Sequence, residues 1–319
     1  MKKSDLTDDQ QSRISFAVQQ CFNTTDWELM NILSGASGSF VYKINIHKKP
    51  YVIKLDNIDD KNFDLIRCYD LLENVSRQGI TPQVYFTDAA RGVVLMKYIE
   101  TKPFSHSELK SVKQFASFIR KLHDGPLFSQ WKSIFKILDY LYQQLTSDYQ
   151  ESEYIQKNIQ EASRLQADLS DPADLRSCHG DLNPYNLLFD GNELYLIDWA
   201  TASPQNFYFD LACCANFFYY DNNELCQIFL TEYFGRQLNR DENKKFRLMQ
   251  KFTHIYYGIM FIFMSLQANI KLLPLSHSDI ESLPAYSEFM QSIGAGKVNL
   301  GDPETQQKFG YVFLKAVAD

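Results

Sequence analysis

The residues best suited to chemistry lie between positions 179 and 198. Asp181 is followed five residues later by Asn186, and Asp198 ends a short apolar segment further on. One carboxylate can accept the proton of an attacking hydroxyl group, while a second carboxylate and an amide oxygen can hold Mg²⁺ on nucleotide phosphates. The pattern predicts ATP- and Mg²⁺-dependent phosphoryl transfer, with Asp181 as the base and Asn186 and Asp198 as the metal ligands.

This segment is built around a predicted hairpin. Two apolar runs, 187–189 and 194–197, are separated by the turn Asp190-Gly191-Asn192. Asp and Asn are also ordinary turn residues. Turn formation alone, however, does not explain a polar loop followed by an apolar hairpin that ends at Asp198. We therefore favour the catalytic interpretation.

Two earlier segments offer groups for the nucleotide phosphates. The run 34–39 contains only Ser, Gly and Ala, so backbone N–H groups at Gly35, Ser37 and Gly38 could approach phosphate oxygens. Lys54 follows one hairpin later, as the one cation of an apolar strand. A small-residue run alone would be a turn, and an isolated strand lysine usually points to solvent. Their order along the chain favours nucleotide binding by both.

A lysine that binds phosphates needs an acidic partner, which we expect on the helix that follows the strand. Glu73 and Asp64 are equally good candidates, and Asp70 is a weaker one. Helix periodicity does not choose among them.

The elements around these groups divide the chain. Residues 1–26 are expected to form a helical extension, with the helix near 6–21. Residues 27–100 are expected to form a β-rich nucleotide-binding lobe. β-Branched and aromatic runs predict its strands, and polar helical spacing predicts its one helix. The strands are expected at 27–33, 40–46, 51–55, 83–87 and 93–98, and the helix at 60–78.

From residue 101 to 319 helical spacing dominates, which predicts a second lobe that carries the catalytic loop and the acceptor site. Ser105 to Glu108 has the serine and glutamate of a capping box. The most apolar stretch, Phe252–Ile270, contains polar residues and is near the lower length limit for a bilayer, so we expect a buried helix.

The composition argues against nucleic-acid binding and bears on the location of the protein. The chain of 319 residues has a formal net charge of −7, so it lacks the basic field that nucleic-acid binding needs. Its six cysteines show no CxxC pairing, and its N-terminus is polar, which together indicate reduced thiols in the cytoplasm. Neither a membrane association nor an obligate protein partner is predicted.

The motifs resemble those of the aminoglycoside phosphotransferases and choline kinases, which share the protein kinase fold. The resemblance covers roughly residues 27–270 and rests on His179-Gly180-Asp181 with Asn186, on Asp198-Trp199 and on Phe209-Asp210-Leu211-Ala212. It implies a two-lobed α+β fold, with a small antiparallel sheet lobe and a larger, mainly helical lobe. It also implies that His179 supports the catalytic loop and that Asp210 braces it.

The same resemblance bears on the adenine site. The segment Val93–Tyr98 is similar to the hinge strand of the family, whose backbone pairs with adenine. Met96 and Tyr98 would therefore contact the base of ATP, although apolar side chains at these positions would serve equally well as core.

The acceptor is expected to be small. Twelve positions separate Asp198 from Asp210, with no Ala-Pro-Glu motif, which leaves no room for a peptide platform. Later tyrosines could surround a quaternary ammonium group, although such rings are more often core; they are Tyr219, Tyr220, Tyr256 and Tyr257.

The resemblance to bacterial choline and ethanolamine kinase-like proteins favours an amino alcohol such as choline or ethanolamine as the acceptor. An aminoglycoside or thiamine is the alternative. A non-catalytic nucleotide-binding protein on the same fold is the rival from another class.

Overall fold

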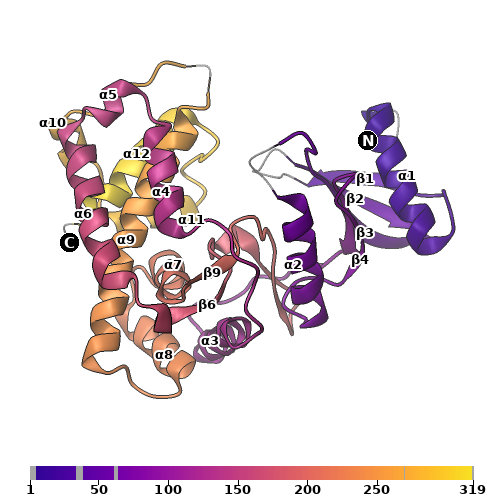
Figure 1. The fold of residues 1–319 in the computed structure, drawn as a ribbon, viewed down its shortest axis with the longest axis horizontal. Coiled ribbons are helices and arrows are strands. Elements are labelled where there is room, and N and C mark those ends of the chain that lie inside the picture. The colour runs from indigo at the N-terminus through magenta and orange to yellow at the C-terminus, as the bar shows by residue number, and fades with distance from the viewer. Residues whose placement is uncertain (1–4, 34–38, 61–63, 269, 318–319) are drawn as a thin grey trace. The chain divides into compact units, whose positions relative to one another are not determined.

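The structure is a computed structural model, which describes residues 5–33, 39–60, 64–268 and 270–317. The chain forms two compact units (Figure 1). Unit 1 comprises residues 1–104 and 185–200, and unit 2 comprises residues 105–184 and 201–319. The boundary between Pro184 and Tyr185 places Asp181 in unit 2 and both predicted metal ligands in unit 1.

Unit 1 is built on a five-stranded antiparallel sheet in the order β1-β2-β3-β5-β4. The strands are β1 (Glu28–Leu33), β2 (Phe40–Ile46), β3 (Lys49–Leu55), β4 (Val84–Asp88) and β5 (Val93–Lys97). The predicted strands agree with these to within two residues. β-Branched and aromatic residues suit a pleated, half-buried surface, which explains the agreement.

One face of this sheet is covered by α1 (Asp8–Phe22). A reciprocal capping box between Thr7 and Gln10 fixes the start of α1. Its Ile14 and Val18 are buried in one cluster with Ile53 of β3. Side chains alternate between the two faces of a strand, so Lys54 lies on the face opposite α1.

The rest of unit 1 consists of α2 (Leu65–Arg77) and the hairpin β7 (Leu187–Phe189) with β8 (Leu194–Leu196). α2 begins later than the predicted residue 60, because Asp64 is its N-cap. A hydrogen bond joins the hairpin to the rest of unit 1: the N–H of Leu196 donates to the carbonyl of Ile80 at 2.8 Å. The predicted hairpin is thus confirmed, and it belongs with the small sheet.

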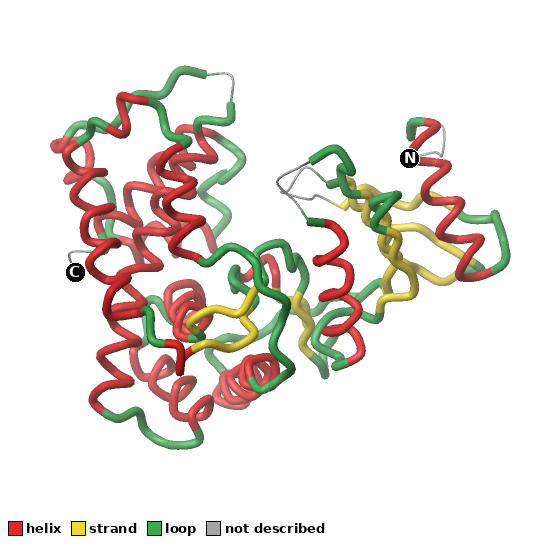
Figure 2. The backbone as a smooth tube through the Cα atoms, viewed as in Figure 1, coloured by secondary structure: helices red, strands yellow, loops and turns green. Residues whose placement is uncertain are grey.

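Unit 2 is mainly helical (Figure 2). Its two short strands, β6 (Leu175–Cys178) and β9 (Ser203–Asn206), pair antiparallel beside the 3-10 turn η2 (Pro172–Asp174), and a second turn, η3 (Pro184–Asn186), spans the unit boundary. Its helices are α3 (Leu109–His123), α4 (Ile134–Gln143), α5 (Ser147–Gln150), α6 (Glu153–Leu169), α7 (Tyr208–Phe218), α8 (Asn223–Phe234), α9 (Arg240–Ser265), α10 (His277–Ser282), α11 (Tyr286–Gly294) and α12 (Pro303–Lys315).

The core of unit 2 lies around α7, every residue of which is buried. The long helix α9 packs against it and against α12. Gly258 and Gly310 permit the close approach of α9 and α12, because a Cβ atom on Gly310 would lie 2.7 Å from the carbonyl oxygen of Gly258. α9 is therefore packed closely against both α7 and α12.

One expectation from the sequence is wrong in unit 2, and another is confirmed with different bounds. The predicted capping box at Ser105 is wrong: α3 starts at Leu109 with Glu108 itself as the N-cap, and no side-chain cap hydrogen bond forms. The apolar stretch from Phe252 is confirmed as buried helix, although it is the second half of α9 and the helix ends at Ser265. Within the described ranges, none of the helices combines the length and the apolar character that crossing a bilayer requires.

Candidate active site

A cavity of about 400 Å³ in unit 1 brings together several residues that the sequence singled out. Lys54, Asn186 and Asp198 contribute polar groups to its lining. Met96 and Tyr98 line it as well, among apolar side chains that include Leu33, Val41, Val52, Leu188 and Ile197. An apolar cavity with a few convergent polar groups is the usual form of a small-molecule site.

Asp198 has two properties of a functional residue. Its φ of 63° lies in the left-handed region, which costs a non-glycine residue free energy unless the surroundings enforce it. Its Oδ1 atom is buried and has no hydrogen-bond partner among the described residues. A buried carboxylate oxygen without a partner is rare in folded proteins, and a metal ion would satisfy it.

Asn186 is held close to Asp198 by the hairpin. The backbone N–H of Ile197, the neighbour of Asp198, donates to the carbonyl oxygen of Asn186 at 3.0 Å. Asn186 is also buried. An amide oxygen beside a carboxylate is a donor set that suits Mg²⁺, which prefers oxygen ligands. The residues present therefore fit the implied metal.

Lys54 has a different partner from the one expected. Its Nζ lies 3.0 Å from Oδ1 of Asp56, just beyond the end of β3. The expected partners on α2 are engaged elsewhere: Asp64 caps the helix at the N–H of Arg67, and Glu73 pairs with Arg77 at 3.0 Å. The prediction of Glu73 or Asp64 is wrong because residues two apart share a strand face, which puts Asp56 within direct reach of Lys54.

The other nucleotide-site predictions fall into two groups. Gly35, Ser37 and Gly38 lie outside the described residues. Tyr98 and Met96 do line the cavity, and the Nζ of Lys43 lies 3.8 Å from the centre of the Tyr98 ring.

Asp181 lies in unit 2, in a loop that is fixed from both sides. The hydroxyl of Tyr257 on α9 donates to its Oδ1 at 2.9 Å, and its own backbone N–H donates to Nδ1 of His179 at 3.2 Å. Burial raises the pKa of Tyr257 well above its usual value, so the phenol stays protonated and remains a donor. Gly180 has a φ of 80°, and a Cβ atom there would lie 2.8 Å from the carbonyl of Thr201.

Asp210 ties the same loop to α7. Its two oxygens accept the backbone N–H groups of His179 at 2.8 Å and Gly180 at 2.9 Å. His123 of α3 contacts Asp210 through Nε2 at 3.1 Å, and its Nδ1 lies 2.8 Å from the hydroxyl of Tyr233. This geometry supports a bracing role for Asp210.

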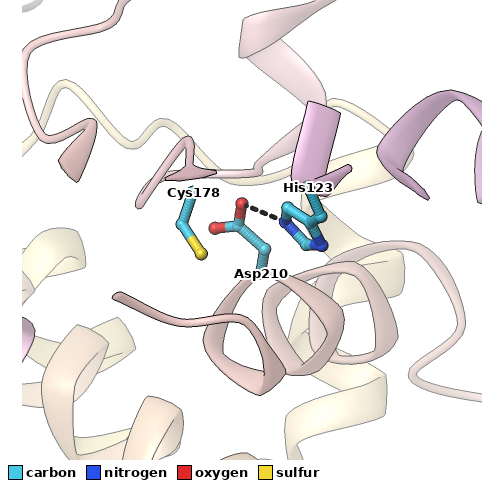
Figure 3. Close-up of side chains that lie close together, drawn as sticks. All are labelled: His123, Cys178 and Asp210. Atoms are coloured by element: carbon cyan, nitrogen blue, oxygen red, sulfur yellow. Dashed lines mark hydrogen bonds and ion pairs between the residues drawn. The ribbon is translucent and has the colours of Figure 1, made fainter. Parts of the chain in front are cut away.

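Figure 3 shows that Cys178 lies beside this pair. His123, Cys178 and Asp210 are close enough together to suggest a metal site. Burial, however, raises the pKa of the Cys178 thiol well above its usual value, and metal ligation needs the thiolate. Both oxygens of Asp210 already accept backbone hydrogen bonds. The cluster is best explained as the support of the loop that carries Asp181.

The four tyrosines proposed for the acceptor do not share one role. Tyr219 and Tyr256 are buried in the core of unit 2, where Tyr219 packs against Phe229 at 5.4 Å and Tyr256 against Phe209 at 5.2 Å. Tyr220 is less buried. Tyr257 contacts Asp181 instead of lining an open space. An aromatic cage made by all four is therefore not supported.

Comparison with known proteins gives consistent matches. The model of the phosphotransferase enzyme family matches residues 28–244. Protein LicA of Haemophilus influenzae is 24% identical over 226 residues, which cover 67% of this chain and 82% of that protein. The structure of the choline kinase LicA from Streptococcus pneumoniae matches with a TM-score of 0.66 and 16% identity, over 92% of this chain and 99% of that one.

A spectinomycin phosphotransferase, solved with ADP and spectinomycin, matches with a TM-score of 0.56 and 17% identity, over 96% of this chain and 98% of that one. Together these matches confirm the resemblance drawn from the motifs and the predicted two-lobed α+β fold.

Proposed function

Because the chain belongs to the phosphotransferase enzyme family, we propose that it transfers the γ-phosphoryl group of ATP to a hydroxyl group of a small amino alcohol, with choline or ethanolamine as the leading acceptors. The observation that carries this proposal is the cavity of unit 1. Lys54, Asn186 and Asp198 line it together, and Asp198 offers it a buried oxygen without a partner among the described residues.

The nucleotide would occupy this cavity. Lys54 supplies a positive charge for the phosphates, and the apolar lining that includes Met96 suits the adenine ring. Asn186 and Asp198 would hold Mg²⁺. When bound, the ion neutralises charge on the phosphate oxygens, which is the main catalytic contribution in phosphoryl transfer.

Asp181 would act on the acceptor. The acceptor oxygen forms a bond to the γ-phosphorus while the bond from phosphorus to the β–γ bridging oxygen breaks, which leaves ADP. The hydroxyl proton passes to the carboxylate of Asp181. The hydrogen bonds from Tyr257 to this carboxylate and from the loop backbone to Asp210 support a fixed position for the base.

A small acceptor is supported by the segment that follows Asp198. Residues 203–206 form β9, and α7 begins at Tyr208, so secondary structure already fills most of the interval before Asp210. The match to the choline kinase LicA favours an amino alcohol. The match to a spectinomycin phosphotransferase makes an aminoglycoside the second candidate.

An acceptor panel tests the proposal. ADP formation from ATP and Mg²⁺ would be measured with choline, ethanolamine, thiamine and several aminoglycosides, each beside a reaction without acceptor. We expect choline or ethanolamine to raise ADP formation at least tenfold over the acceptor-free rate. Stimulation by an aminoglycoside or thiamine alone would reassign the acceptor. Nucleotide binding with no stimulation by any compound would favour the non-catalytic alternative.

A further inference from the structure

The carboxylate of Asp56 has several polar partners, and one of them is Lys54, which lines the proposed nucleotide cavity. Asp56 is only 3% exposed. It accepts hydrogen bonds from the hydroxyl of Ser39 at 2.5 Å and from the hydroxyl of Tyr69 at 2.7 Å, in addition to its ion pair with Lys54. A buried charge is tolerated only when donors and counter-charges compensate it, and here three side chains do so.

The backbone of Asp56 is fixed as well. Its N–H donates to the carbonyl of Gly92 at 2.7 Å. The guanidinium of Arg13, on α1, donates to the carbonyl of Asp56 at 2.7 Å and to that of Gly92 at 2.6 Å. Gly92 has a φ of 56°, and a Cβ atom there would lie 2.7 Å from the carbonyl oxygen of Asp56. The carboxylate is therefore held in place independently of Lys54.

The helix α2 contributes a hydroxyl group to this cluster where an acid was expected. Tyr69 is buried, and both burial and the neighbouring Asp56 raise the pKa of its phenol, so it stays protonated and donates. The acids of α2 and of its cap, Asp64, Asp70 and Glu73, are exposed or partly exposed. α2 thus reaches the ammonium group of Lys54 through Asp56.

Asp56 also lies close to the predicted metal ligand. A small cavity of about 50 Å³ is lined by Lys54, Asp56 and Asp198 together with Tyr69. Lys54 and Asp198 line the larger cavity as well. A change in the position of Lys54 would therefore be felt where nucleotide phosphates and Mg²⁺ are proposed to bind.

We propose that Asp56 is the positioning residue of the phosphate-binding Lys54, and that Tyr69 connects α2 to this ion pair. Asp56 thus takes the place of the helix acid that protein kinases use, and its carboxylate also accepts a hydrogen bond from Ser39, the last residue of the run 34–39. The inference rests on the proposed nucleotide site but is independent of the acceptor. It assigns both residues to phosphate recognition and not to adenine recognition.

Titrations of the intact chain test this inference. The dissociation constants of Mg²⁺-ADP and of adenosine, which has no phosphate, would be measured for the wild type, Asp56→Asn and Tyr69→Phe. Asp56→Asn removes the charge that positions Lys54, and we expect it to weaken ADP binding about tenfold. Tyr69→Phe removes one hydrogen bond to Asp56, and we expect it to weaken ADP binding about threefold. Adenosine affinity should stay within about twofold of wild type in both variants, since neither residue is assigned to the base.

A double-mutant cycle with Lys54→Ala separates positioning from a general structural effect. If Asp56 acts through Lys54, then Asp56→Asn should change ADP affinity by less than about twofold in the Lys54→Ala background. An equal loss in both backgrounds, an equal loss for adenosine, or unchanged ADP affinity in both single variants would overturn the inference. Tyr69→Phe keeps the test informative if Asp56→Asn does not fold.

The matched control is Asp88→Asn. Asp88 lies in the same sheet, and its carboxylate pairs with Arg91 at 2.8 Å, away from either cavity lining. Its removal should leave both affinities unchanged. No acceptor is present in these titrations, so an error in the proposed acceptor class does not affect them.

Discussion

The hydrogen bond from Tyr257 to Asp181 allows a quantitative prediction about the base. Tyr257→Phe removes one oxygen atom and keeps the ring, which packs edge-on against Phe217 at 4.8 Å and stacks on Phe313 at 5.7 Å. The substitution therefore tests the hydroxyl group alone. The nearby Cys213, whose sulfur lies 3.5 Å from the same hydroxyl, loses a weak contact.

The expected magnitude follows from orientation and not from the strength of the bond. A hydrogen bond to a charged carboxylate is strongest before the proton arrives, so its free energy does not by itself lower the barrier. The hydroxyl of Tyr257 instead holds the carboxylate of Asp181 in one orientation. Small misplacements of a catalytic group are costly, and for this one we expect about a tenfold decrease in kcat, or about 1.4 kcal/mol. The KM for ATP should not change, because the proposed nucleotide cavity lies in unit 1.

The assay is ADP formation at saturating acceptor, with KM for ATP determined in parallel and the fold checked by thermal unfolding. Tyr311→Phe is the matched control: Tyr311 is a fully buried tyrosine of α12, and its hydroxyl accepts a hydrogen bond from the N–H of Leu275 at 3.3 Å. It should lose comparable stability and retain kcat. A Tyr257→Phe enzyme with wild-type kcat, or with kcat no lower than that of Tyr311→Phe, would refute the reasoning.

Two further predictions concern the metal and pH. Asp198→Asn should weaken ADP binding at least tenfold in the presence of Mg²⁺ and leave binding without Mg²⁺ nearly unchanged; equal weakening in EDTA would argue against a metal role. His254 is buried between Tyr286 and Phe313, and burial lowers its pKa to about 4. The unfolded chain takes up a proton on His254 below about pH 6.5, whereas the folded chain does so only near pH 4. The free energy of unfolding should therefore fall by up to roughly 3 kcal/mol between pH 6.5 and 4. Urea titrations at several pH values should show a smaller fall for His254→Gln than for the wild type.

The strands of unit 1 and the hairpin β7–β8 could be predicted from sequence because their signals are local. Apolar alternation and turn residues occur within a few positions of each other, and the separation of Asp181 from Asn186 is read directly from the chain. The start of α3 could not be predicted in the same way. Ser105 and Glu108 have the spacing of a capping box, but the helix begins only after Glu108 and no side chain caps it.

The contacts that support the proposed site were harder to predict, because they join distant segments. Tyr257 is 76 positions from Asp181, and Tyr233 is 110 positions from His123. Nothing in the local pattern distinguishes these tyrosines from core residues. Asp56 is the exception: it stands two positions after Lys54, so strand periodicity alone could have identified it as the partner.

Asp181→Asn tests most directly whether Asp181 is the base. We expect this variant to bind Mg²⁺-ADP with wild-type affinity, since the cavity of unit 1 is unchanged, and to form ADP in the presence of acceptor about 10²–10⁴ times more slowly. Turnover within tenfold of wild type, with nucleotide binding intact, would contradict the assignment of Asp181 as the base.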